Sequence, residues 1–232
     1  MKAIFKREML SYFTSPIGYV FLGIFMLVSG SYYREALFVH KQGDMCLLLS
    51  SCMAMLMLLI PVITMRLLSE EKSSKTDQLL LTSPVKVWEI VIGKYLAAFS
   101  VFMLSVVTTL PYLLVAAKWG TVVWIEILPA YLGYILVGAL LIAIGLFISA
   151  MTESQFVAAV ITYGVIMAVQ FITSVNTGNE ILDAALKYLC LLDWSNEFYY
   201  SIISVSNVFY YLSFTAVFVF ATVRKVESRR WK

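Results

Sequence analysis

The chain has 232 residues, of which 61% are apolar and only 13% are charged, and its mean hydropathy is +0.88. A soluble domain of this length could not cover its surface with so few charged side chains, so the composition excludes the ordinary soluble classes. The formal net charge is only +3, and no soluble basic face remains that could bind nucleic acid. We therefore predict a membrane protein.

Six stretches are long and apolar enough to span a membrane as helices. A spanning helix needs about 20 mainly apolar residues, and these runs lack the alternation that marks the strands of an outer-membrane barrel. The predicted spans are residues 17–33, 45–67, 88–117, 125–151, 155–175 and 206–223. The fold class that we expect is therefore an all-α polytopic membrane protein, with six transmembrane helices in a single domain over residues 1–232.

Residues 1–15 precede the first span and predict a helix that lies in the membrane interface. Phe5, Met9 and Tyr12 fall on one face of this helix, while Lys6 and Arg7 lie towards the other. No signal-peptide cleavage site follows the first apolar run. The sequence "FTSPIGYV" then closes the interfacial piece with a Ser-Pro pair, which suits the start of the next helix.

Basic residues are distributed unevenly between the two sides of the predicted spans. If the N-terminus is cytosolic, 13 of the 17 Lys and Arg residues lie on the inner side and 4 on the outer side. Cytosolic loops of membrane proteins carry such an excess of Lys and Arg. We therefore expect both termini in the cytosol, with residues 224–232 as a basic cytosolic tail.

The predicted spans carry almost no ionisable side chain away from their ends, since Lys94 and Glu126 lie near expected boundaries. A charge inside a membrane costs about 2.5–3.5 kcal/mol on insertion scales and marks ion pathways, so an ion-coupled carrier is disfavoured. The single histidine, His40, has no partner pattern for protease chemistry. No phosphate-binding G-x-x-x-x-G-K-[ST] loop occurs, and the three cysteines lack metal-ligand spacing. The chain is therefore either powered by another protein or passive.

The most polar stretch of the chain, residues 68–87, separates the second and third predicted spans. We expect the second span to continue past Arg66 and to end at the Ser73-Ser74 pair. A short cross-helix would follow over residues 75–81, and Pro84 suits the first turn of the next membrane helix.

Three leucines of this loop, Leu79, Leu80 and Leu81, would lie outside the membrane plane. Such an exposed apolar turn predicts a docking knob, with Glu71 and Lys72 at its polar rim. The alternative is that the leucines fold against the chain's own interfacial helix.

The stretch "LLSEEKSSKTDQLLLTSPV" (67–85) resembles the cytosolic signature of ABC-2 type permeases, also called type V ABC exporters. The sequence "IFKREMLSYFTSPIGYVFLGIFMLVSG" (4–30) looks like the branch that includes gliding-motility and copper-oxidase-maturation permeases. The sequence "SNVFYYLSFTAVFVFATVRKVESRRWK" (206–232) is similar to that branch's last helix and basic tail. Lys75 stands where this family usually has Gly, and Gln78 where it has an acidic residue.

This resemblance implies a permease subunit of an ATP-driven exporter in the bacterial cytoplasmic membrane. Its implied partners are a second copy of this permease or a related one, two separate ABC ATPase subunits, membrane lipids and a candidate accessory extracytoplasmic subunit. The ATPase subunits would bind ATP and Mg, and this chain would hold no cofactor and no catalytic residue.

In the family, the loop after the second helix is the coupling helix, which seats in a groove of the ATPase. The positions that match this coupling signature are Glu70, Glu71, Lys72, Thr76, Gln78, Leu79, Leu80, Leu81, Thr82, Ser83 and Pro84.

Residues 176–205 form the longest predicted outer segment, between the fifth and sixth spans. Their apolar residues recur at helical spacing, which favours helices that lie in the interface or re-enter the membrane. The candidate outer-gate residues are Trp194, Phe198, Tyr199 and Tyr200. The alternative is a plain anchoring loop with aromatic side chains at headgroup depth.

A series of small residues lies within the fourth predicted span, residues 125–151, which belongs to the block of spans over 88–175. Small residues allow membrane helices to approach closely. The series comprises Gly133, Gly138, Ala143 and Gly145.

Two functions stay open on the residues themselves. The first is a permease coupled to a separate ATPase, and the second is a passive membrane scaffold or assembly factor with the same fold. ATP hydrolysis by the purified complex would separate them. An apolar pathway is compatible with a lipid, a lipid-linked sugar, a peptide or a drug as substrate.

Overall fold

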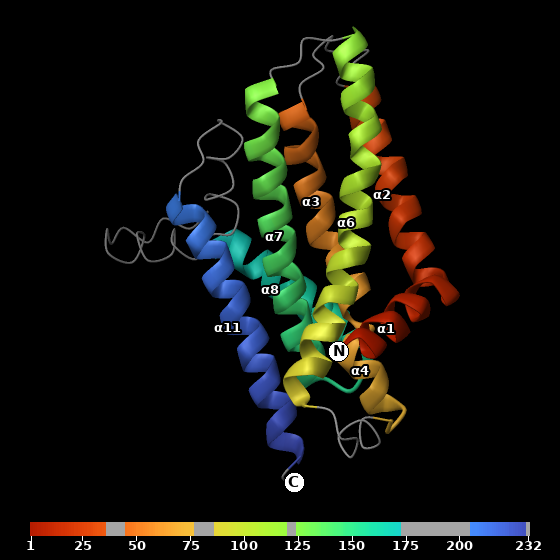
Figure 1. The fold of residues 1–232 in the computed structure, drawn as a ribbon, viewed down its shortest axis with the longest axis vertical. Helices are drawn as coiled ribbons and strands as arrows, with labels where there is room; N and C mark the ends of the chain where they lie inside the picture. Colours follow the sequence, from red (N-terminus) through yellow and green to blue (C-terminus); the bar gives the residue numbers. More distant parts are fainter. Residues whose placement is uncertain (36–44, 77–85, 120–123, 173–204, 231–232) are drawn as a thin grey trace.

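The computed structural model describes residues 1–35, 45–76, 86–119, 124–172 and 205–230. Within these ranges the regular structure is helical and contains no strand, which confirms the expected all-α class (Figure 1). The helices are α1 (Lys2–Thr14), α2 (Pro16–Arg34), α3 (Met45–Thr64), α4 (Arg66–Ser73), α6 (Val87–Trp119), α7 (Trp124–Met151), α8 (Gln155–Ile172) and α11 (Val205–Arg230).

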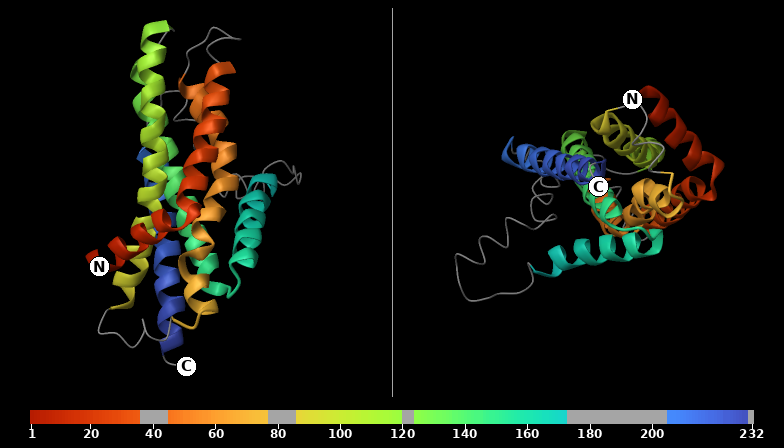
Figure 2. Two further views of the ribbon diagram at one scale, coloured as in Figure 1. Left: turned by 90° about the vertical axis from the view of Figure 1, so that its right-hand side faces the viewer. Right: turned by 90° about the horizontal axis from the view of Figure 1, so that it is seen from below.

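Among the described residues, five helices are long and apolar enough to cross a membrane. They cover Pro16–Arg34, Leu48–Ser73, Val87–Lys118, Ile125–Met151 and Val205–Arg229. The fifth expected span, residues 155–175, corresponds to α8, whose apolar part is shorter, and residues 173–175 lie outside the described ranges. Figure 2 shows that α8 runs obliquely to the other long helices.

Successive long helices run in opposite directions, so several of their described ends gather at two ends of the bundle (Figure 1). The end of α4, the start of α6 and the end of α11 lie at one end of the bundle, here called the lower end. The ends of α2 and α6 and the starts of α3 and α7 lie at the opposite, upper end. The described helix ends that flank residues 77–85 therefore lie opposite those that flank residues 36–44 and 120–123.

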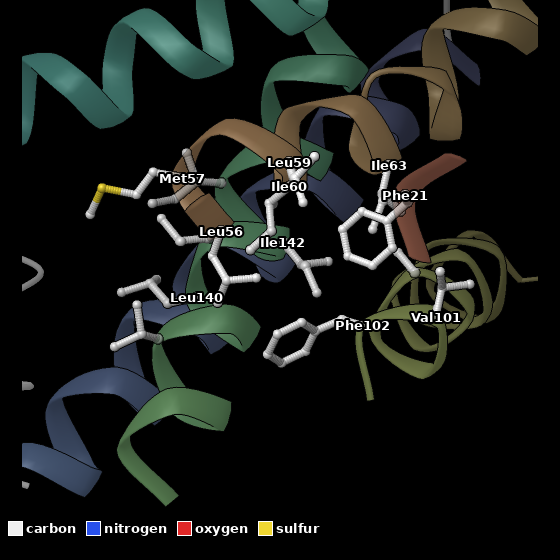
Figure 3. Packing of buried hydrophobic residues seen from close by; sticks show 14 of the residues in the cluster. Phe21, Leu56, Met57, Leu59, Ile60, Ile63, Val101, Phe102, Leu140 and Ile142 are labelled. Carbon is white, nitrogen blue, oxygen red and sulfur yellow. The ribbon is translucent and has the colours of Figure 1, made fainter. Parts of the chain in front are cut away.

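The core lies where α2, α3, α6 and α7 meet (Figure 3). Side chains from these four helices point toward one another, and Phe21, Leu56, Ile60, Phe102 and Ile142 are all fully buried. Helices in a membrane associate through close packing, because lipid tails are as apolar as the side chains themselves. The core therefore depends on how closely these helix backbones can approach.

Two glycines of α7 permit such close approach, which confirms the prediction from the series of small residues. A Cβ atom added at Gly138 would lie 2.3 Å from the ring of Phe102 on α6, and one at Gly145 would lie 2.2 Å from Thr64 on α3. Gly133 and Ala143 are buried on the same helix. The small residues of α7 thus set its distance from α6 and α3.

We expect Gly138→Ala to destabilise the fold by about 1–3 kcal/mol, because the added methyl overpacks the core against Phe102. Thermal unfolding of the purified protein in detergent would measure this loss. Gly23→Ala on α2 is the matched control, since no atom lies within 4 Å of its added Cβ, and alanine favours a helix over glycine. Equal melting temperatures for the two variants would contradict the packing role of Gly138.

Candidate functional site

The described part of the polar loop begins with α4, which continues from α3 at the lower end of the bundle (Figure 1). Met65 separates the two helices, and its amide N–H still donates to the Pro61 carbonyl at 2.9 Å. The prediction that the second span runs past Arg66 and ends at the Ser73-Ser74 pair is confirmed, since α4 ends at Ser73. Whatever fixes α4 therefore fixes the base of the following loop.

A buried cation lies beside α4, at the centre of a group that we call the Lys94 cluster: Arg7, Glu8, Glu71 and Lys94. The Lys94 side chain on α6 is only 1% exposed. Its Nζ lies 3.1 Å from Glu8 Oε1 and 3.0 Å from Glu71 Oε1, and it donates to the Leu67 carbonyl at 2.6 Å. Arg7 Nη2 pairs with both carboxylates. Two cations and two anions from α1, α4 and α6 thus balance one another.

The local sequence explains how α1 reaches this site. A Cβ atom at Gly93 would lie 3.2 Å from Ile4 Cγ2, so the glycine next to Lys94 lets α1 cross α6 closely. The crossing brings Glu8 to Lys94, and the N-terminal amine of Met1 lies 3.3 Å from Glu89 of α6. This outer pair is largely solvated and contributes little.

The electrostatics of the cluster favour the charged forms of Glu8 and Arg7. Burial by itself would raise the pKa of the Glu8 carboxyl, but the charge of Lys94 and the hydrogen bonds from Arg7 and Lys94 outweigh it, so this pKa is lowered. Burial would likewise lower the pKa of Arg7, but hydrogen bonds and charges of Glu8 and Glu71 raise it. The carboxylate of Glu8 therefore stays ionised, and its contribution to stability is lost only as the pH falls through its lowered pKa.

The opposite side of α4 is held by the C-terminal end of α7, through contacts that we call the α7 clasp. Lys72 Nζ donates to the carbonyls of Ala150 and Thr152, the latter at 3.0 Å. Ser149 Oγ accepts from the amides of Leu68 and Ser69, each at 3.1 Å. A cation at a helix C-terminus also complements the helix dipole.

Arg66 and Tyr12 connect α1 to the junction of α3 and α4. The Arg66 guanidinium donates to Ser15 Oγ at 2.6 Å and to Ser11 Oγ at 2.8 Å. The fully buried Tyr12 hydroxyl donates to the Ile63 carbonyl at 2.8 Å. These bonds satisfy polar groups that would otherwise be costly to bury.

These contacts change two expectations about charged residues. Lys94 lies near the start of the 33-residue α6, as expected, but its side chain is buried and paired. Glu71 and Lys72 do not form a free polar rim, because both side chains are turned into the chain by the Lys94 cluster and the α7 clasp.

The family model described as "ABC-2 family transporter protein" matches residues 3–224. The chain belongs to this family. A comparison with curated proteins gave no match. As an ABC-2 family member, the chain is the membrane component of an ABC transporter, and such components usually work with ABC ATPase subunits.

The positions of this ABC-2 protein that were predicted from the sequence to couple it to an ATPase are only partly described. Glu70, Glu71 and Lys72 lie on α4, and Thr76 follows in the turn. Outside the described residues lie Gln78, Leu79, Leu80, Leu81, Thr82, Ser83 and Pro84, together with the outer-gate candidates Trp194, Phe198, Tyr199 and Tyr200.

The turn after α4 explains why ABC-2 permeases favour glycine where this chain has Lys75. Thr76 N–H donates to the Glu71 carbonyl at 2.9 Å and Lys75 N–H to the Lys72 carbonyl at 3.1 Å, which is the pattern of a Schellman motif. Lys75 occupies the left-handed position of that motif, with a φ of 55°. Glycine adopts this conformation without steric cost.

Lys75→Gly should therefore stabilise the folded ABC-2 protein by about 0.5–1 kcal/mol, since it removes the strain of a left-handed side-chain residue. The melting temperature in detergent would report the gain. Lys75→Ala is the control, because alanine keeps the Cβ atom and the strain. A gain of equal size for both variants would mean that the lysine charge, and not the backbone, is responsible.

Four residues of this site were not predicted from the sequence: Arg7, Glu8, Lys94 and Ser149. Only Lys94 carries a signal that could have found it, since a lone charge inside "IVIGKYLAAF" (90–99) suggests a buried partner. Its partner Glu8 is 86 residues away in the sequence. Within the described ranges, no group of three or more potential metal ligands occurs.

Proposed function

We propose that this chain is the permease subunit of an ATP-driven exporter and that the loop after α4 couples it to separate ATPase subunits. The observation that carries the proposal is the fixation of α4 on two sides, by the Lys94 cluster and by the α7 clasp. A segment that receives force from a partner must begin on a rigid base, because a loose base would absorb the movement. The loop of residues 74–86 begins on such a base.

The energy source in this proposal lies in the partner. The chain lacks the glycine-rich loop that holds nucleotide phosphates. Two ATPase subunits per complex would bind ATP and Mg, and two permease copies, or this chain and a related one, would form the substrate pathway. The resemblance to the gliding-motility and copper-oxidase-maturation branch supports an exporter of the type V class.

The proposed topology has six spans, with α8 as the fifth, and both termini in the cytosol of a bacterial inner membrane. The grouping of the described helix ends at the two ends of the bundle supports it, as does the excess of Lys and Arg in the segments of the lower end. Single cysteines at positions 2, 74, 119, 180 and 230 would be labelled in intact cells with an impermeant reagent. We expect 119 and 180 to react, and reaction of 74 or 230 without 119 would contradict the topology.

The outer segment is proposed as a gate for an amphipathic substrate. Its aromatic residues Trp194, Phe198, Tyr199 and Tyr200 support this, because such side chains suit the headgroup region. Substitution of Trp194 or Tyr199 by alanine would then reduce transport while the ATPase stays bound.

The experiment that tests the function is purification of the tagged permease from its native membrane. We expect a separate protein with a phosphate-binding loop to co-purify and to hydrolyse ATP in the complex. A permease that is purified intact, with no ATPase and no ATP hydrolysis, would contradict the proposal and would favour the passive scaffold.

A further inference from the structure

Among the described residues, Lys94 of α6 is the charged side chain that is fully buried, and it contacts two other helices at once. Its Nζ contacts Glu8 of α1, Glu71 of α4 and the carbonyl of Leu67. Burying a cation is costly unless partners surround it. Replacing a buried ion pair by apolar side chains of similar volume is often neutral or stabilising. Stability alone therefore does not explain why a cation is buried at this position.

The junction between α3 and α4 is a natural place for bending. Met65 separates α3 from α4, although its amide N–H still donates to the Pro61 carbonyl. Pro61 lies one turn earlier, inside α3. Proline removes one backbone donor from a helix and favours kinks. Without a lateral support, α4 could turn about this point when a partner pushes the loop that it carries.

The Lys94 cluster supplies that support. Glu71 lies on α4, five residues beyond its first residue Arg66, so its ion pairs act on the helix away from Met65. The pairs attach α4 to α6, and through Glu8 and Arg7 to α1. A push on α4 would therefore move α1 and α6 as well.

The helix α6 reaches from the cluster to the upper end of the bundle. It has 33 residues, or about 50 Å at 1.5 Å per residue. Near its upper end, α6 and α7 form an open apolar pocket of about 590 Å³, lined by Leu110 and Leu113 of α6 and by residues of α7 that include Leu128 and Tyr131. A displacement of α6 would thus change the spacing of these helices on the far side.

We propose that Lys94 is a positioning residue for coupling: it joins α1, α4 and α6 into one rigid unit that passes movement of the loop after α4 into α6. This inference rests on the proposed function, in which that loop receives the ATPase. The α7 clasp limits the same helix from the other side, so α4 is guided between two contacts instead of bending at Met65.

The test measures movement at the upper end in the complex of permease and ATPase, reconstituted in lipid nanodiscs. Spin labels on cysteines at Leu114 of α6 and Ile125 of α7, in a background without the native cysteines, report the spacing of the two helices. Both side chains are exposed, at 75% and 80%. The distance is measured without nucleotide and with ATP trapped by vanadate.

The decisive variant is Lys94→Met combined with Glu8→Gln and Glu71→Gln, which removes the ion pairs without leaving either carboxylate charged. Lys6→Met is the matched control, because it makes the same change at an exposed lysine of α1. Lys94→Arg tests rescue, since arginine restores a cation. We expect the wild type and Lys6→Met to show an ATP-dependent change of the distance between the two labels. The triple variant should lose this change while it retains the ATPase. Lys94→Arg should show part of the change.

Two results would overturn the inference but leave the proposed function intact. One is a triple variant that keeps the full ATP-dependent change. The other is a triple variant that no longer retains the ATPase. In that case the cluster would be needed for binding of the ATPase, and not for transmitting movement from the loop to α6. A wild-type permease that retains no ATPase at all would instead overturn the proposed function itself.

Discussion

Lys94→Met lowers the free energy of unfolding of this permease by about 3 kcal/mol, which is the low end for a buried ion pair that loses one partner. The loss is large because Glu8 and Glu71 keep their charges, with side chains only 13% and 14% exposed, while the cation between them is gone. Arg7 still faces both carboxylates, which keeps the loss from being larger. Equilibrium unfolding in detergent would measure it.

The matched comparison separates charge imbalance from loss of packing. Adding Glu8→Gln and Glu71→Gln to Lys94→Met should recover most of the stability, because no unpaired charge stays buried. Lys6→Met should leave the melting temperature unchanged, since this lysine is exposed. If Lys94→Met alone unfolds no more easily than Lys6→Met, the cluster does not stabilise the fold.

If the proposed coupling is correct, we expect Leu80→Ser to weaken binding of the ATPase by roughly 10- to 100-fold. The expectation follows from the docking knob, in which Leu80 enters an apolar groove of the partner. Burial of one leucine contributes about 1.5–3 kcal/mol, and each 1.4 kcal/mol changes an affinity about tenfold. Titration of purified ATPase onto the permease in nanodiscs would give the dissociation constant.

Leu80→Met is the control for this second prediction, because methionine keeps a similar apolar volume and should bind nearly as well as the wild type. A Leu80→Ser protein with normal affinity and normal transport would remove this residue from the interface. The same result at Leu79 and Leu81 would refute the docking knob. If the substitutions lower the melting temperature of the permease without any partner, the leucines pack on the chain's own interfacial helix instead.

The corrected position of Lys72 changes what its substitution should do. The sequence suggested a rim residue of small effect, but its ammonium binds the carbonyls of Ala150 and Thr152 at the end of α7. Its removal would loosen α4 from α7, so a transport defect in Lys72→Ala would not identify a contact with the ATPase. Contacts of the loop are therefore better probed at its leucines.

The sequence by itself determined the class of the protein and most helix limits, because these depend on local properties of the chain. Apolar runs of about 20 residues specify spanning helices whatever lies beside them, and five of them form helices of sufficient length. Ser15 precedes α2 and Pro16 opens it, as the Ser-Pro pair predicted. The pair Ser73-Ser74 likewise ends α4. The family signature at 67–85 also lies in one continuous stretch.

Only the tertiary structure decided which charges meet and which side chains are turned inward. Lys94, Glu71 and Glu8 belong to three helices. Nothing in the segment around Lys94 indicates that its partners include Glu8, which is 86 residues away in the sequence. The prediction from the sequence considered α6 by itself in lipid, where an unpaired Lys94 charge would have to lie near water. The fold supplies the counter-charges instead, because Gly93 lets α1 cross beside Lys94 and the turn of α3 into α4 brings Glu71 to it. Whether a side chain is buried and which charge it pairs with depend on several helices together. The sequence of a single segment therefore could not predict the burial and the partners of Lys94.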